Sequence, residues 1–161
     1  MLVRGCIYQR QQGYYRQQIV AALPEVIFKG LEAADRALTV FDKDTDLNEL
    51  ASVINSYPFF SGQSLVVLKD EKLLGAKAES DSKKQQLDKL AEVLADIPEY
   101  CTVLVSASKL DKGTKLFKAL KKQALMCECV SIKLNNLSQW LEGQAREYGA
   151  RWSFDAIGRI V

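Results

Sequence analysis

The sequence predicts an α/β protein with a mainly parallel, five-stranded sheet. Five short apolar runs have the length of strands, and amphipathic helical patterns lie between them. Strands that alternate with helices favour a parallel sheet covered by helices on both faces. The composition agrees with this fold class, because 161 residues with 48% hydrophobic and 26% charged side chains are typical of a globular protein of one domain or slightly more.

The predicted strands and helices follow one another in a regular order. The apolar runs that predict strands are residues 3–8, 38–41, 65–68, 102–106 and 126–132. The helical patterns are residues 13–23, 25–37 (helical in part), 46–57, 84–97 and 114–123. The segment 74–84 is polar and has little apolar content, so we predict an exposed, mobile connection there.

The helix at residues 46–57 has the clearest pattern. Its apolar side chains recur at the spacing i, i+3, i+4, i+7, and Asp46 with Glu49 predicts a capping box at its start. The helix at residues 84–97 has a similar apolar face and is closed by Pro98. Both helices are therefore expected to pack on the sheet.

The pattern changes after residue 134. Residues 137–148 form an amphipathic helix with Trp140 and Leu141 on its apolar side, and Gly149 ends it. A further helical pattern from Ser153 or Asp155 runs to the last residue. We therefore predict two domains, residues 1–134 and residues 135–161, the second being the truncated beginning of a helical domain.

The composition excludes several classes of chemistry. The chain has no histidine, which removes the commonest general base and zinc ligand and rules out a Ser-His-Asp triad. Its four cysteines form no CxxC pair, so we interpret them as core residues in a reducing compartment rather than metal ligands. No segment resembles a signal peptide or a membrane span, which predicts a cytoplasmic protein. The net charge of +2 is too small to indicate nucleic-acid binding by itself.

Phosphate chemistry is not supported by the motifs. A Walker A loop requires glycines and a lysine followed by serine or threonine, whereas residues 8–14 contain one glycine and no lysine. Residues 65–71 resemble a Walker B strand, but Lys69 interrupts the motif, and we interpret Asp70 and Glu71 as a solvated turn. We therefore expect no catalytic residue, no cofactor and no metal ion.

Two surface features remain open to a functional interpretation. Lys115, Lys118 and Lys122 fall on one helical face, where they could contact phosphates or simply form the solvated side of an amphipathic helix, which is the commoner case. Pro58 ends a helix before Phe59 and Phe60, so this aromatic pair lies on a connection. The pair could enter a partner's pocket, although spacing alone favours the protein's own core.

The order of the segments resembles the N-terminal domain of the delta subunit of bacterial DNA polymerase III. The first matching segments are LTVFD (38–42), DLNEL (46–50), YPFFS (57–61) and LVVLKD (65–70). The later ones are TVLV (102–105), KLDK (109–112), KLFKALKK (115–122), LSQW (137–140) and AREYG (145–149). One segment departs from the family pattern, because Tyr8 is followed by Gln-Arg-Gln-Gln instead of glycine and two acids.

The resemblance implies a fold and a function. The fold would be AAA+-like, that is, a P-loop NTPase fold without a functional Walker A motif. The protein would be a non-catalytic clamp-loader subunit of the polymerase holoenzyme, a nucleotidyltransferase assembly. Its partners would be the ring-shaped sliding clamp (the beta subunit), sister clamp-loader subunits and primer-template DNA, with no membrane involved.

The resemblance also implies a binding site. By position, Pro58, Phe59, Phe60 and Ser61 correspond to the family's clamp-binding residues, whose apolar pair enters a hydrophobic pocket on the clamp. At least one of the two rings is then expected to be exposed. The alternatives are a divergent P-loop nucleotide-binding protein and a DNA-binding domain that uses the lysine-bearing helix.

Overall fold

The computed structural model describes residues 5–9, 14–75, 80–129, 134–147 and 149. The chain divides into two compact units, Met1–Cys129 and Val130–Val161. The boundary thus lies five residues before the one that the sequence pattern suggested. The first unit contains all the described strands and carries the features that matter for function.

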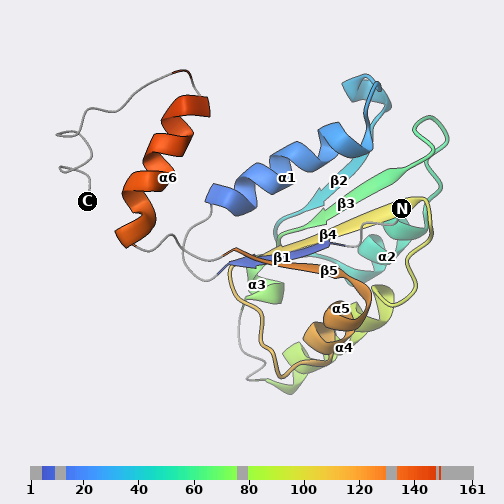
Figure 1. The fold of residues 1–161 in the computed structure, drawn as a ribbon. Helices are drawn as coiled ribbons and strands as arrows, with labels where there is room; N and C mark the ends of the chain where they lie inside the picture. Colours follow the sequence, from blue (N-terminus) through green and yellow to red (C-terminus); the bar gives the residue numbers. More distant parts are fainter. Residues whose placement is uncertain (1–4, 10–13, 76–79, 130–133, 148, 150–161) are drawn as a thin grey trace. The chain divides into compact units, whose positions relative to one another are not determined.

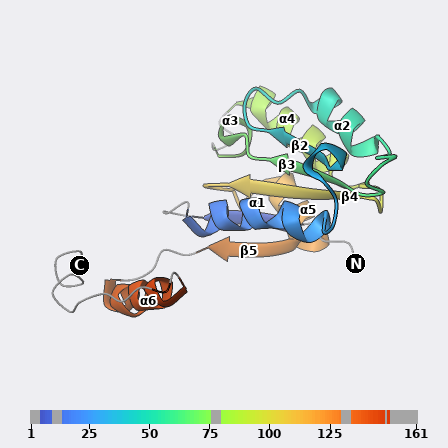
Figure 2. The same ribbon diagram turned by 90° about the horizontal axis from the view of Figure 1, so that it is seen from above.

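The first unit is built on a parallel sheet in the order β2-β3-β4-β1-β5. Each pair of neighbouring strands in this sheet is parallel, and Figure 2 shows the arrowheads of β4 and β5 at the same side. The strands are β1 (Gly5–Gln9), β2 (Ala37–Phe41), β3 (Ser64–Leu68), β4 (Cys101–Ala107) and β5 (Leu125–Cys129). The prediction of a parallel sheet is confirmed, and each strand lies within a few residues of its predicted position.

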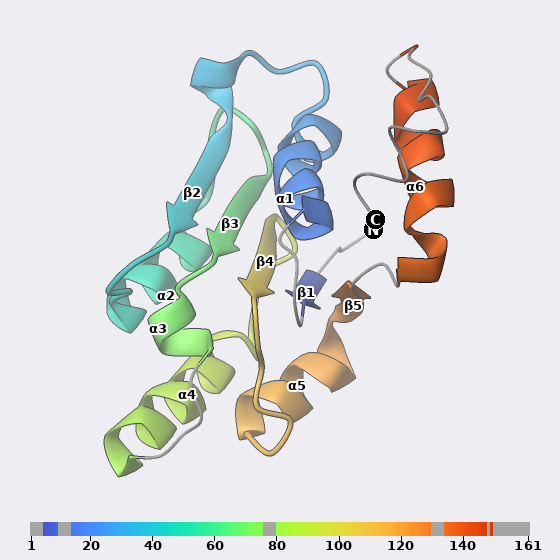
Figure 3. The same ribbon diagram turned by 90° about the vertical axis from the view of Figure 1, so that its left-hand side faces the viewer.

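Helices cover the two faces of this sheet (Figures 1 and 3). The helix α1 covers one face, and α2, α4 and α5 cover the other. The helical segments of this unit are α1 (Tyr14–Ile27), the 3-10 turn η1 (Ala33–Asp35), α2 (Leu47–Asn55), α3 (Glu71–Leu74), α4 (Asp81–Val93) and α5 (Lys115–Gln123).

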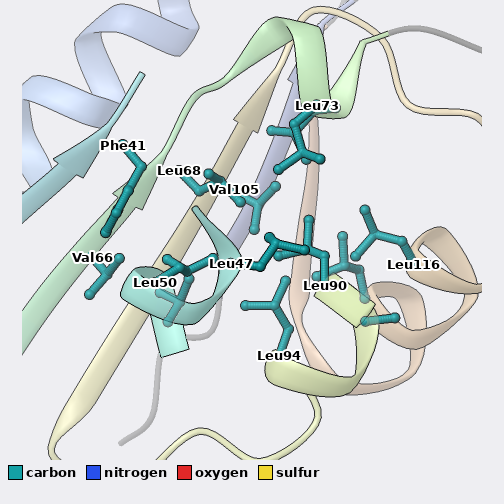
Figure 4. Packing of buried hydrophobic residues seen from close by; sticks show 14 of the residues in the cluster. Phe41, Leu47, Leu50, Val66, Leu68, Leu73, Leu90, Leu94, Val105 and Leu116 are labelled. Atoms are coloured by element: carbon teal, nitrogen blue, oxygen red, sulfur yellow. The ribbon is translucent and has the colours of Figure 1, made fainter. Parts of the chain in front are cut away.

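The larger core lies between the sheet and the layer of α2, α4 and α5. Figure 4 shows apolar side chains from these helices converging on β3 and β4. Leu50 of α2 and Leu90 of α4 are completely buried, as their helical spacing predicted. Leu94 and Ile97 are also buried although α4 ends at Val93, so the chain keeps its apolar contacts beyond the last helical turn.

The smaller core lies under α1, which packs on Leu65, Val67 and Leu104. This single helix leaves the edge strand β2 partly uncovered. Leu38 and Val40 pair with Leu65 and Val67 in register and therefore lie on the same face, yet they are exposed. The sheet thus ends in a small apolar surface at this edge.

Three helical segments differ from the sequence prediction. The helix α1 continues through Pro24 to Ile27 because Phe28, which follows it directly, is buried among the apolar residues of that face. The segment 25–37 is helical in part, as predicted, but not as a separate helix: residues 25–27 are the end of α1, residues 28–30 form a turn, and Ala33–Asp35 form the 3-10 turn η1. The predicted exposed connection at 74–84 is wrong at Leu74, which is buried in α3, and over residues 80–84, because Ser80 caps α4 by accepting a hydrogen bond from the backbone N–H of Lys83. Residues 76–79 of this segment lie outside the described residues.

The second unit contains α6 (Leu134–Glu147), which begins three residues earlier than predicted. Gly149 has a positive φ of 68°, and its N–H donates to the carbonyl of Arg146 at 3.0 Å. This is the helix-terminating geometry expected of a glycine. The further helix predicted from Ser153 or Asp155 lies outside the described residues.

The cysteine interpretation is half right where it can be checked. Cys101 is a fully buried free thiol in β4, and burial raises its pKa, whereas Cys127 is free and exposed. No cluster of potential metal ligands occurs among the described residues. In the same part of the chain, no helix is long and apolar enough to span a membrane.

Candidate functional site

The loop between α2 and β3 carries the predicted site. We call residues 57–61 the aromatic tip. The helix α2 begins at its cap Asp46, which accepts from the N–H of Asn48 rather than forming the predicted capping box with Glu49. It ends at Asn55, and Ser56 turns into an extended conformation with φ −80° and ψ 121°. The loop then projects beyond the amino end of β3 (Figure 1).

Both phenylalanines of the aromatic tip point into solvent. Phe59 is 87% exposed and Phe60 is 88% exposed, while Pro58 and Ser61 are half-buried. Each ring carries a large apolar surface, so leaving both in water is unfavourable for the isolated protein. The prediction that at least one ring is exposed is confirmed, and the core interpretation drawn from spacing alone is wrong.

Hydrogen bonds close the loop behind the two rings. The N–H of Gly62 donates to the carbonyl of Pro58 at 2.9 Å, with Gly62 in a left-handed conformation at φ 64°. The hydroxyl of Ser61 donates to the carbonyl of Gln63 at 2.6 Å. A residue with a Cβ would be strained at the positive φ of Gly62, so this glycine suits the turn.

Two tyrosines brace the aromatic tip from the side. The ring of Tyr57 makes edge-on contacts with Phe59 at a centroid distance of 5.6 Å and with Tyr100 at 5.2 Å. The hydroxyl of Tyr100 donates to the carbonyl of Asn55 at 2.8 Å, and its own carbonyl accepts from the N–H of Ser64 at 2.8 Å. Tyr100 therefore ties the end of α2 to the start of β3.

The elements on both sides of the loop are firmly packed. Leu50 and Ile54 of α2 are fully buried, and all five residues of β3 are buried. The aromatic tip is therefore a short exposed segment held between two fixed ends. Such an arrangement suits binding, since little conformational freedom is left to be lost when a partner docks.

The opposite end of β3 contains an acidic residue that is completely enclosed. Asp70 is 2% exposed and caps α3 by accepting from the N–H groups of Lys72 and Leu73. It also accepts from the N–H and hydroxyl of Thr45 at 3.0 and 2.9 Å. Burial alone would raise the pKa of Asp70, but the bonds from Thr45, Leu73 and Lys72 outweigh it and hold the pKa below its ordinary value.

Glu71 joins three elements at the same end of the sheet. Its carboxylate accepts from the N–H and hydroxyl of Ser108, just beyond β4, and from Arg16 of α1 at 2.6 Å. Burial would raise the pKa of Glu71, yet the bonds from Ser108 and Arg16 lower it overall. The two acids that resemble a Walker B motif therefore have a structural role, because they link the segment after β3 to Thr45, Ser108 and Arg16.

The interpretation of Asp70 and Glu71 as a solvated turn is wrong for Asp70, which is buried, and wrong for the local conformation, although Glu71 is exposed. Glu71 begins the short helix α3, which the sequence analysis missed. The signal was present, because aspartate followed by Glu-Lys-Leu-Leu is a typical helix start. The glutamine-rich turn after β1, which bears on the missing phosphate loop, lies mostly outside the described residues, since 10–13 are not described.

The lysines predicted to share a face do so on α5. Lys115, Lys118 and Lys122 are exposed, whereas Leu116 and Leu120 are buried in the larger core. The amphipathic pattern is thus confirmed. The structure does not join these lysines to the aromatic tip in one site, because the helix α4 packs against α5 on this face of the sheet, and α2, which leads to the tip, packs against α4.

The parallel sheet, with a helical layer on each face, defines an α/β protein of three layers. A family model described as DNA polymerase III, delta subunit, matches residues 20–130. This chain belongs to that family.

Known proteins agree with this assignment. The chain is 25% identical over 144 residues to DNA polymerase III subunit delta of Bacillus subtilis (strain 168), covering 88% of this chain and 41% of that protein. The structure of the Bacillus subtilis DNA clamp loader delta protein matches with a TM-score of 0.70 at 22% identity, covering 99% of this chain and 48% of that one.

A second solved structure shares the fold at lower similarity. It is a DNA polymerase III gamma subunit-related protein from Thermotoga maritima, with a TM-score of 0.55 at 14% identity. The match covers 88% of this chain and 45% of that protein. The chain thus spans less than half the length of the relatives that it matches.

Proposed function

We propose that this chain is the clamp-binding part of a clamp-loader delta subunit, with an AAA+-like fold that lacks a functional Walker A motif. Pro58, Phe59, Phe60 and Ser61 bind the ring-shaped sliding clamp, the two phenylalanine rings entering an apolar pocket on its surface. Docking of the tip opens the ring so that it can be loaded onto primed DNA.

The exposure of both phenylalanine rings carries this proposal. The rings are 87% and 88% exposed on a loop whose ends are fixed. Buried aromatic anchors dominate the energy of many protein interfaces, and two adjacent rings on a braced loop present such an anchor before the partner arrives. The membership of the chain in the delta family supports the choice of the clamp as that partner.

Ring opening would follow from differential affinity. A closed ring and an open ring are two states of the clamp, and a ligand shifts their populations only as far as it binds one state better. Full burial of each phenylalanine contributes roughly 1.5–3 kcal/mol. If the pocket accepts both rings only in the strained or open form, their burial offsets part of the interface energy that holds the ring closed.

Tyr57 and Tyr100 would act as positioning residues. Tyr57 contacts Phe59, and Tyr100 holds Tyr57 while its hydroxyl bonds to the end of α2. Fixing a loop in its bound conformation improves affinity because less entropy is lost on binding. Pro58 adds to this effect by restricting its own φ.

The chain itself would carry no catalytic step. Asp70, the acid at the end of the Walker B-like strand, already accepts four hydrogen bonds from Thr45, Lys72 and Leu73. In this proposal ATP is hydrolysed by sister subunits, and the assembled loader works in the cytoplasm on primer-template DNA.

Calorimetric titration with the cognate sliding clamp tests the proposal. The double variant F59A/F60A is expected to lose several kcal/mol of binding free energy, which is at least about a hundredfold in Kd. A matched control is L38A/V40A, which removes two exposed apolar side chains from the edge strand β2, outside the aromatic tip. The control is expected to bind the clamp with unchanged affinity.

Two outcomes would contradict the assignment. If F59A/F60A binds the clamp as tightly as the unmodified chain, the aromatic tip is not the anchor. If L38A/V40A loses affinity instead, the apolar edge at β2 is the clamp-binding surface.

A further inference from the structure

The outer side of the edge strand β2 is unpaired. Figure 3 shows β2 at the margin of the sheet beyond β3, and in the part of the chain that the structure describes no strand pairs with its other side. The carbonyl of Phe41 accepts from the N–H of Lys69, just beyond β3, so the backbone groups of every second residue, counted back from Phe41, face β3. The backbone groups of Leu38 and Val40 therefore point away from the sheet, where they form a template for pairing with another chain.

The side chains of this edge do not protect it from pairing. Edge strands usually avoid association through charged side chains or proline within the strand, but β2 reads Ala-Leu-Thr-Val-Phe. Leu38 is 40% exposed and Val40 is 47% exposed. The N–H of Leu38 donates locally to the carbonyl of Arg36 at 3.0 Å, which leaves the carbonyl of Leu38 and both backbone groups of Val40 for a partner strand.

The sequence around Thr39 is complementary to itself. Residues 35–43 read Asp-Arg-Ala-Leu-Thr-Val-Phe-Asp-Lys. A second copy that runs antiparallel, with the two Thr39 residues opposite each other, places Leu38 opposite Val40. The same register brings opposite charges together in the pairs Arg36–Asp42 and Asp35–Lys43. Cross-strand pairs of this kind, apolar with apolar and acid with base, stabilise antiparallel strands.

The backbone of β2 agrees with this register. Opposite residues of an antiparallel pair alternate between positions that exchange hydrogen bonds and positions that do not. Leu38 and Val40, whose backbone groups point outward, fall at the bonding positions, whereas Thr39, whose groups face β3, falls at the other kind. A shift of two residues in either direction keeps this bonding pattern but separates Asp42 from Arg36 and Lys43 from Asp35.

The charges at the two ends of β2 favour the antiparallel arrangement. Asp35, Asp42 and Lys43 are exposed and make no ion pair within the described ranges. Arg36 already bonds to Glu25, yet its guanidinium group carries further N–H groups that can donate. A parallel pairing of two copies would instead place each charge opposite the same charge, which is destabilising.

We propose that the outer edge of β2 is a self-association surface, through which two copies of this chain pair antiparallel about a two-fold axis at Thr39. The pairing joins the two sheets and covers the exposed side of Leu38 with Val40 of the second copy. Because both copies use the same surface, the contact closes on itself and gives a dimer rather than a fibre. A strand of five residues forms a small contact, so the dimer is expected to be weak and reversible.

The dimer leaves the aromatic tip accessible. The tip precedes β3, which runs parallel to β2, so an antiparallel pairing of two β2 strands puts the two tips at opposite ends of the joined sheet. Self-association and the proposed clamp binding therefore use different surfaces. The experiment below uses this chain alone, so its result does not depend on the proposed function.

Analytical ultracentrifugation of the unmodified chain, from about 1 µM to about 1 mM, tests the inference. The average mass is expected to rise with concentration toward twice that of a single chain. Val40→Pro removes an outward N–H and adds a ring at the edge, but it removes no bond to β3, so it is expected to fold and to stay monomeric. Urea unfolding checks the fold. Val40→Lys, which keeps the N–H and adds a charge at the edge, is expected to stay monomeric as well. A folded variant of either kind that dimerises like the unmodified chain would overturn the inference.

A charge exchange tests the register. Lys43→Glu puts an acid opposite Asp35 and is expected to weaken dimerisation at least about threefold at about 50 mM salt, where screening is weak. The double variant D35K/K43E restores opposite charges and is expected to regain the affinity of the unmodified chain. Lys118→Glu makes the same change of charge on an exposed position of α5 and is the matched control, which is expected to dimerise normally. If D35K/K43E dimerises no better than Lys43→Glu, the pairing about Thr39 is wrong.

The aromatic tip is the competing surface for self-association, because it also exposes apolar side chains. F59A/F60A is expected to dimerise like the unmodified chain. Loss of self-association in F59A/F60A would assign the contact to the aromatic tip and overturn the inference. An unmodified chain that stays monomeric up to about 1 mM, or that associates beyond the dimer, would overturn it as well.

Discussion

The two ends of β3 adjoin side chains in opposite environments, a charged group that is buried and apolar groups that are exposed. At the carboxyl end, Asp70 is a charged group that is almost completely buried, and every oxygen of its carboxylate is engaged by a donor. At the amino end, Phe59 and Phe60 are apolar groups that remain almost completely exposed. Each placement is unfavourable for an isolated side chain, but only the first is compensated within the protein.

The two ends of β3 therefore contribute to different properties, the carboxyl end to the stability of the fold and the amino end to binding. The bonds to Asp70 are formed in the folded chain, so their energy contributes to folding. The apolar surface of the two rings gains nothing until a partner covers it, so its energy is available for association. The fully buried strand β3 connects these two ends and gives the exposed loop a fixed base.

The largest effect on stability is expected at the carboxyl end. Asp70→Ala removes the cap of α3 and leaves the N–H and hydroxyl of Thr45 without their acceptor. We expect the free energy of unfolding, measured in urea, to fall by about 2–4 kcal/mol. Asp44→Asn is the control, since Asp44 is an exposed acid in the same region whose surface pair with Lys72 is screened by solvent, and asparagine tolerates the positive φ of 44° at this position.

If Asp44→Asn destabilises the protein as much as Asp70→Ala, the enclosed position of Asp70 does not account for its effect. Affinity for the clamp should stay normal in both variants at temperatures where they are folded. A loss of clamp binding in folded Asp70→Ala would mean that the two ends of β3 are coupled.

The contribution of Asp70 should depend on pH. The pKa of Asp70 is lowered in the folded protein, so its stabilising effect is present above the unfolded pKa of about 3.9 and is lost as pH falls through the folded value. Asp70→Asn has a neutral side chain of the same size. The difference in unfolding free energy between the unmodified chain and Asp70→Asn is therefore expected to be largest near pH 7 and to shrink below about pH 4.

The pKa of Glu71 is also lowered, so the stabilising effect of Glu71 is likewise lost as pH falls. Glu71 is present both in the unmodified chain and in Asp70→Asn. Its contribution therefore cancels in the difference. A gap that stays constant from about pH 7 to pH 3 would indicate that the charge of Asp70 is not what stabilises the fold.

Tyr100 is expected to affect both stability and binding, because it stabilises the fold and positions the aromatic tip. Tyr100→Phe keeps the ring contact with Tyr57 and removes the hydroxyl that bonds to Asn55. We expect a loss of about 0.5–1.5 kcal/mol in unfolding free energy and a weakening of clamp binding by a few-fold. Tyr100→Leu, which removes the ring as well, should weaken clamp binding further. Equal clamp affinity in all three proteins would exclude a positioning role.

The regular parts of the fold could be predicted from the sequence because their periodicity reflects burial. Leu47, Leu50 and Ile54 are buried at the spacing that predicted α2, and the all-apolar run of β3 is a strand buried on both faces. Two elements could not be predicted in this way. The helix α3 has only four residues, too few for a periodic signal, and α1 passes through Pro24 because packing beyond it outweighs the proline.

The candidate site could be predicted from residue spacing only in part. Spacing placed Phe59 and Phe60 on a connection but favoured burial, because aromatic side chains usually contribute to the protein's own core. The exposed conformation depends on long-range contacts, such as the bond from Tyr100 to Asn55, that join residues 45 positions apart. The family resemblance gave the correct expectation for the rings because it carries information about a partner, which a single chain's burial pattern does not contain.

The smallest effect on stability is expected where the effect on binding is largest. F59A/F60A removes two rings that are nearly fully exposed, so little buried apolar surface disappears from the folded chain. We expect its unfolding free energy in urea to stay within about 0.5 kcal/mol of the unmodified value, the range of ordinary surface substitutions. The ring of Phe59 packs edge-on against Tyr57, and Tyr57 keeps its second ring partner, Tyr100, in the variant. A destabilisation of about 2 kcal/mol or more would show that the rings pack into the fold in solution, and the contrast between the two ends of β3 would then disappear. An unchanged stability together with the absence of clamp binding would instead assign the energy of these two rings to association.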